Sequence, residues 1–95
     1  MQIDSIRHKA LRRFAESGSP KGLPAGSVDR LLRMFAYIDA IDTAEELRVP
    51  PNFGAHQLTG DRKGEWSLFV TKNWRMTFRV NSAGAVEDMD LEDYH

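Results

Sequence analysis

The last three residues of the sequence, Asp93-Tyr94-His95, bring together a carboxylate, a phenol and an imidazole. Histidine exchanges a proton near neutral pH, which suits a general acid or a general base. A polar tripeptide at a chain end is nevertheless more often a solvated tail than a site. These residues are therefore candidates for chemistry only in the company of other groups.

A second set of polar side chains, Arg75, Thr77 and Arg79, alternates with the apolar residues of segment 74–80. Alternate residues of a β-strand point to opposite faces of the sheet. We therefore expect these three side chains on the face that lies away from the core and is open to a ligand. Arginine is also common on solvated surfaces, so the spacing alone does not identify a site.

The remaining histidines offer weaker signals. His56 precedes a predicted turn, and His8 lies in a basic segment with helical spacing; both positions suit ordinary surface or structural histidines. The sequence contains no cysteine and no H-E-x-x-H pattern. We accordingly expect neither a metal nor another cofactor.

Two helices must position part of this chemistry. The segments 6–17 and 28–38 both show helical spacing of apolar residues. Gly18-Ser19-Pro20 should end the first helix, and Ser27 should cap the second. Thr43-Ala44-Glu45-Glu46 fits a capping box and predicts a short helical turn. The predicted apolar stripes are Ala10, Leu11, Phe14 and Ala15 in the first helix, and Val28, Leu31, Leu32, Phe35 and Ile38 in the second.

After Pro50-Pro51 the spacing changes to the alternation of β-strands. We expect strands at residues 53–58, 66–71, 74–80 and 85–91, and a short first strand near Ile3 and Ile6. The connection Thr71-Lys72-Asn73 is short enough for a hairpin. The sequence therefore predicts an α+β fold in which an N-terminal strand and a two-helix hairpin pack on one face of a small antiparallel sheet.

Length and charge limit the range of functions. The 95 residues suit one compact domain over residues 1–95, and no stretch approaches the ~20 apolar residues of a membrane span. We expect a protein of the cytoplasm that makes no membrane contact. The net charge of −1 argues against a globally basic nucleic-acid binder, so any RNA contact must be a local patch. Its candidate cations are Arg62, Lys63, Lys72 and Arg79.

Three motifs taken together resemble the HigB-type toxins of the RelE/ParE superfamily. They are residues 58–67, residues 73–78 and the closing Asp93-Tyr94-His95, and the opening residues 6–11 are also similar. The motifs occur in the family's order and extend over essentially the whole sequence. The resemblance implies the RelE-like version of the predicted fold.

The resemblance also implies a toxin that cuts mRNA in the ribosomal A site without a metal. Arg75 would stabilise negative charge on phosphorus, and His95 would transfer a proton. Tyr94 would stack on or orient a base, while Asp93 would fix the local geometry. His56 corresponds to a histidine that precedes the family's Leu-x-Gly turn.

The implied partners are the ribosome, mRNA and a cognate antitoxin of the HigA type that carries a helix-turn-helix. Such complexes bind operator DNA through the antitoxin, which gives the toxin a regulatory role as well. Direct DNA binding by the toxin is not expected, because its own sequence shows no helix-turn-helix pattern.

One residue departs from the family pattern. Thr59 stands where HigB-type toxins can carry a catalytic lysine, and a hydroxyl cannot supply that charge. Arg62 or Lys63, in the same predicted turn, are candidates to substitute for it. A non-catalytic alternative therefore stays open, in which the domain blocks a target such as gyrase, as ParE-like members of the superfamily do.

Overall fold

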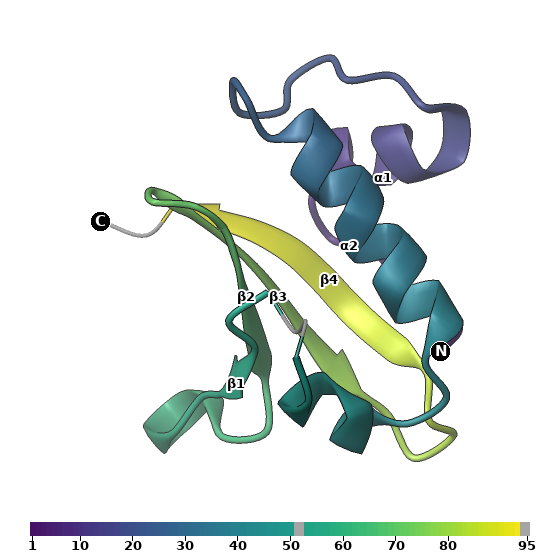
Figure 1. Cartoon of the computed structure of the whole chain (residues 1–95), viewed down its shortest axis with the longest axis vertical. Coiled ribbons are helices and arrows are strands. Elements are labelled where there is room, and N and C mark those ends of the chain that lie inside the picture. Colours follow the sequence, from purple (N-terminus) through teal and green to yellow (C-terminus); the bar gives the residue numbers. More distant parts are fainter. Residues whose placement is uncertain (51–52, 94–95) are drawn as a thin grey trace.

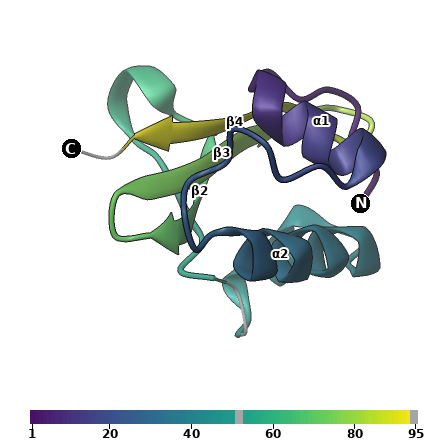
Figure 2. The same cartoon turned by 90° about the horizontal axis from the view of Figure 1, so that it is seen from above.

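The structure, a computed structural model, describes residues 1–50 and 53–93. Four strands form one antiparallel sheet in the order β1-β2-β3-β4, and both α-helices lie on the same side of it (Figures 1 and 2). The predicted α+β architecture is confirmed. The elements are α1 (Lys9–Ser17), α2 (Val28–Ala40), the 3-10 helix η1 (Ala44–Arg48), β1 (His56–Gln57), the 3-10 helix η2 (Gly60–Arg62), β2 (Trp66–Thr71), β3 (Trp74–Val80) and β4 (Val86–Asp93).

Helix α1 begins later than predicted, because His8 occupies its N-cap. The His8 imidazole accepts a hydrogen bond from the backbone N–H of Leu11 at 3.1 Å. The helix ends at Gly18, whose φ of +78° is readily adopted only by glycine and whose N–H donates to the carbonyl of Phe14. The predicted end of α1 is therefore confirmed, whereas its predicted beginning at residue 6 was wrong.

Helix α2 differs from its prediction in two details. Ser27 precedes it, but the hydroxyl donates to the carbonyl of Pro24 at 2.6 Å and does not cap the helix. Leu32, expected in the core, is 54% exposed, and Met34 is buried in its place. The buried stripe runs through Leu31, Met34 and Ile38, whose spacing follows one face of the helix more closely than the predicted set.

The N-terminal segment does not form the predicted strand. Ile3 and Ile6 instead make two isolated parallel bridges to β4, at Val86 and Met89. Between these bridges β4 is irregular, since Asp88 has a φ of +54° and its N–H bonds to the hydroxyl of Ser5. The segment therefore covers the edge of β4 without extending the sheet regularly.

The first predicted strand is much shorter than expected. Of residues 53–58, only His56 and Gln57 pair with β2, because Phe53 and Gly54 form a turn with positive φ angles. The last strand runs two residues further than predicted, to Asp93. Both differences concern the edges of the sheet, while β2 and β3 closely match the predicted ranges.

The core lies between the helices and one face of the sheet. The alternation in β2 and β3 is confirmed, since Trp66, Leu68, Met76 and Phe78 are all buried there. Helices α1 and α2 meet this layer and each other, with the rings of Phe14 and Phe35 6.2 Å apart. The opposite face of the sheet is left for other contacts.

Replacing Trp66 or Phe78 by alanine should lower the free energy of unfolding by about 3–5 kcal/mol, because both rings are at most 2% exposed and their removal leaves a cavity. Urea denaturation measures the change. Leu32→Ala on the exposed side of α2 is the matched control, with an expected change within about 0.5 kcal/mol. Equal losses in all three variants would contradict this packing.

Candidate active site

A pocket of about 280 Å³ lies on the sheet face opposite the helices. Cross-strand register places Phe69, Arg75 and Glu92 in one row of this face, and Ser67 and Thr77 in the next. The loop that contains η2 closes one side. The pocket is lined by Leu58, Thr59, Arg62, Ser67, Arg75, Thr77, Glu92 and Asp93.

Arg75 is the central cation of this pocket. Its Nη1 donates to the backbone carbonyls of Thr71 at 3.2 Å and Trp74 at 3.4 Å. Its guanidinium also packs against the ring of Phe69, 4.8 Å from the ring centre. These contacts fix the position of the group, and its delocalised charge suits recognition of a phosphate.

A compact ion cluster contributes Arg62 and Glu92 to the pocket lining. The guanidinium of Arg62 donates to Glu65 at 2.9 and 3.0 Å and to Glu92 at 2.8 and 2.5 Å. Thr77 donates its hydroxyl to Glu92, and Arg79 lies 3.6 Å from Glu65. We refer to Arg62, Glu65, Glu92 and Arg79 as the ion cluster. It fastens η2 to the sheet and balances two cations with two carboxylates.

The ion cluster shifts the acidity of its members. Hydrogen bonds from Arg62 lower the pKa of Glu65 and of Glu92 from the ordinary value of 4.5, outweighing the opposing effect of burial. The two glutamates in turn raise the pKa of Arg62 above its ordinary value. Both carboxylates are therefore ionised at neutral pH, and the positive charge of Arg62 is paired with them.

The open face is less open than the sequence suggested. Ser67 and Thr77 point away from the core, yet each is only 3% exposed. The hydroxyl of Thr77 donates to Glu92 of the ion cluster, a tertiary contact that alternation along a strand does not reveal. Thr77 therefore lies on the predicted face and lines the pocket, but it is much less exposed than expected.

The other predicted site residues divide into three groups. Asp93 lines the pocket at the end of β4. His56 is exposed and pairs in register with Ser67. The Nδ1 atom of His56 lies 3.2 Å from the carbonyl oxygen of Gly54. Lys63 and Lys72 are exposed outside the pocket lining. Tyr94 and His95 lie outside the described residues.

Glu92 is a lining residue that the sequence analysis missed. The last strand was expected to end at Leu91, two residues before its observed end at Asp93. Continuing the alternation of buried Met89 and Leu91 would have placed Asp90 and Glu92 on the outer face, beside Thr77 and Arg75. The alternation therefore indicated Glu92, but the predicted strand ended before that residue.

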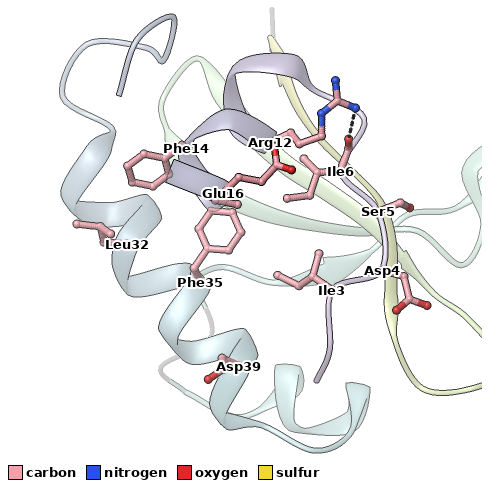
Figure 3. A pocket seen from close by; sticks show the side chains of 11 residues that line it. Ile3, Asp4, Ser5, Ile6, Arg12, Phe14, Glu16, Leu32, Phe35 and Asp39 are labelled. Carbon is pink, nitrogen blue, oxygen red and sulfur yellow. Dashed lines mark hydrogen bonds between the residues drawn. The ribbon is translucent and has the colours of Figure 1, made fainter. Parts of the chain in front are cut away.

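A larger pocket of about 700 Å³ lies elsewhere, between the N-terminal segment, α1 and α2. Figure 3 shows the rings of Phe14 and Phe35 at its wall, with Leu32 and Ile3 nearby and the Arg12 side chain bonded to the carbonyl of Ile6. Its lining is mostly apolar and includes none of the predicted site residues. The smaller pocket is therefore the candidate active site.

Within residues 1–50 and 53–93, no three or more histidine, cysteine or acidic side chains come together in a group that could hold a metal ion. The same residues include no helix long and apolar enough to cross a membrane.

The comparison with known protein families decides the identity of this fold. The family model described as the RelE-like toxin of type II toxin-antitoxin system HigB matches residues 4–95. The chain belongs to the HigB family of RelE-like toxins. The family resemblance of the sequence is thereby confirmed, and membership implies an antitoxin partner.

Two relatives show how far the similarity extends. The toxin is 40% identical over 95 residues to the Endoribonuclease HigB of Proteus vulgaris, covering 98% of this chain and 99% of that protein. It is 31% identical over 75 residues to Toxin HigB-1 of Vibrio cholerae serotype O1 (strain ATCC 39315 / El Tor Inaba N16961), covering 78% and 79% of the two chains. Both alignments span most of each protein.

The ion cluster should make stability depend on pH in the acid range. The pKa values of Glu65 and Glu92 are lower in the folded state than in the unfolded state. Their contribution to the free energy of unfolding is therefore complete above about pH 4.5, and it is lost as the pH falls through the folded pKa values. Urea denaturation across this range should show a steeper loss in the wild type than in the Glu65→Gln/Glu92→Gln double variant. Glu16→Gln on the exposed side of α1 is the control, and a double variant that matches the wild-type slope would argue against the cluster.

Proposed function

We propose that this toxin is a ribosome-dependent endoribonuclease that cuts mRNA and so inhibits translation. The observation that carries the proposal is the pocket that brings Arg75 of β3 and Asp93 of β4 together. Asp93 directly precedes Tyr94-His95 in the sequence. The 40% identity to a protein named Endoribonuclease HigB, over nearly the whole length of both chains, supports it.

The proposed reaction is attack of a ribose 2′-hydroxyl on its own 3′-phosphodiester. A base removes the 2′-hydroxyl proton, a new oxygen–phosphorus bond forms, and the bond to the 5′-oxygen of the next nucleotide breaks while an acid protonates that oxygen. The products are a 2′,3′-cyclic phosphate and a 5′-hydroxyl end. All the atoms involved come from the RNA and from proton donors and acceptors of the protein.

Each step needs a group of suitable chemistry. Arg75 is placed to stabilise the additional negative charge on phosphorus, because a guanidinium binds two phosphate oxygens at once. His95 is our choice for proton transfer, and His56, which pairs with Ser67 of the pocket lining, is a second candidate. Asp93 and Tyr94 would orient the nucleotide and the histidine. No metal or cofactor enters this scheme.

The RNA-binding role predicted for the exposed lysines Lys63 and Lys72 belongs to this proposal. The role of Arg62 and Arg79 in RNA binding is less direct, because both already contact carboxylates of the ion cluster. Phosphates would have to compete with Glu65 and Glu92 for them. Their contribution should consist mainly of shaping the pocket.

The remaining partners follow from this function. The antitoxin would be of the HigA type with a helix-turn-helix, through which the complex contacts operator DNA. The substrates, ribosomes and translated mRNA, would place the toxin in the cytoplasm.

Arg75→Ala and His95→Ala should each slow mRNA cleavage by about a hundredfold or more, since each removes a group that acts in the transition state. Mapping transcript 5′ ends after brief induction measures this, and the wild type should yield new 5′-hydroxyl ends only on translated mRNA. Arg13→Ala on α1 is the matched control. Growth arrest by the wild type with intact transcripts would favour the target-blocking alternative instead.

Thr59→Lys should increase the cleavage rate roughly tenfold, because Thr59 lines the pocket and the lysine would add a cation near the reacting phosphate. Single-turnover cleavage on programmed ribosomes provides the measurement. Thr59→Ser serves as the control and should leave the rate unchanged. A rate for Thr59→Lys equal to that of Thr59→Ser would show that this toxin does not use a cation at position 59.

A further inference from the structure

Two arginines and two phenylalanines alternate along the edge of β2, beside the active-site pocket. The Cζ atom of Arg30 lies 5.0 Å from the ring centre of Phe53 and 5.2 Å from that of Phe69. The Cζ atom of Arg75 lies 4.8 Å from the ring centre of Phe69. We call Phe53, Arg30, Phe69 and Arg75 the arginine–aromatic row.

Backbone contacts hold the row in place. The Nε of Arg30 donates to the carbonyl of Phe69 at 2.8 Å, and the N–H of Phe69 donates to the carbonyl of Phe53 at 2.7 Å. These bonds satisfy the edge of β2 at the point where the short strand β1 no longer covers it. Arg30 therefore reaches from α2 to the sheet edge, and the row ends at Arg75 in the pocket.

Arg30 of this row differs from the arginines of the ion cluster in how its charge is held. Among residues 1–50 and 53–93, no carboxylate forms an ion pair with Arg30. Burial, and then the charge of Arg33, lower the pKa of Arg30, as expected for a cation placed among rings without a counterion. A positive charge that aromatic faces hold without neutralising it remains available to a polyanion.

Phe69 is also unusual in its exposure. The residue is 38% exposed, whereas the other phenylalanines and Trp66 are buried or half-buried. It lies on the same sheet face as Arg75 and directly opposite it in the register. A nucleotide whose phosphate contacts Arg75 therefore has its base within reach of Phe69.

We propose that Phe69, with the guanidinium groups of Arg30 and Arg75, forms a stacking site for one unpaired base of single-stranded RNA, next to the phosphate at the pocket. Bases stack on aromatic rings and on guanidinium planes irrespective of sequence, and arginine adds a cation–π contribution. This proposal rests on the proposed endoribonuclease function, for which it names a substrate-binding surface.

A binding experiment tests the site without requiring cleavage. The probe is a short unpaired oligoribonucleotide with 2′-deoxyribose substitutions that prevent attack, and with a fluorescent adenine analogue whose emission is quenched by stacking. Phe69→Leu, which keeps an apolar side chain but removes the ring, should weaken binding at least about fivefold and abolish the quenching. Phe69→Trp should retain both, since it restores a stacking surface.

Matched controls separate stacking from folding. Leu32→Ala alters another exposed apolar residue, and Arg33→Gln alters a neighbouring arginine of α2, so both should bind the probe like the wild type. Arg30→Gln should weaken binding, and thermal melting of each variant reports its folding. If Phe69→Leu unfolds, the Phe69→Trp and Arg30→Gln variants still decide the question through the quenching signal.

The possible results distinguish this proposal from the broader function. Equal affinity and quenching for the wild type and Phe69→Leu, or no RNA binding by the wild type, would overturn the stacking site even if ribosome-dependent cleavage occurs. Conversely, a wild type that binds the probe through Phe69 but leaves translated mRNA intact would overturn the endoribonuclease function alone.

Discussion

The register of β2, β3 and β4 is the constraint on which the rest of this structure depends. Because side chains alternate between the two faces, a shift of one residue would exchange the core with the active-site face. The observed pairing of Leu68 with Met76 and of Phe69 with Arg75 keeps both surfaces intact. Burial on one face, which is worth about 25 cal/mol per Å² of apolar surface, thus also fixes the placement of the polar groups on the other.

The polar face carries two arginine arrangements of opposite electrostatic character. In the ion cluster, Arg62 meets two carboxylates, and the charges cancel while the η2 turn is held against β4. In the arginine–aromatic row, Arg30 lies against the rings of Phe53 and Phe69, which attract a cation without neutralising it. A protein with a net charge of −1 can in this way present a local positive surface to RNA.

The candidate active site and the larger apolar pocket lie on different parts of the protein. The smaller pocket is built from strands and one short turn, so its residues sit on elements whose positions the core determines. The larger pocket has mostly apolar walls and lies between helices that meet through one aromatic contact. The separation leaves the pocket face of the sheet and the helical face as distinct surfaces of the protein.

Much of this protein could be predicted from its sequence, because local physics determines it. Alternation in residues 66–71 and 74–80 gave the central hairpin, the glycine at position 18 gave the end of α1, and three short motifs indicated the HigB family. Arg75 and Asp93, both selected from sequence, line one pocket. These features depend on neighbours within a few residues or on motifs that are contiguous in the chain.

Contacts between distant segments decided the rest. The bonds of Arg62 to a carboxylate of the sheet depend on Glu92, 30 residues away. The cation against the ring of Phe69 comes from Arg30, 39 residues away in the other direction. The extent of the two edge strands likewise depends on contacts outside them. The turn at Phe53 shortens β1, and the N-terminal segment covers the edge of β4. The sequence by itself determined which side chains each strand presents on which face; only the tertiary structure decided which of those side chains are neutralised, covered or left exposed, because that depends on what the fold places opposite them.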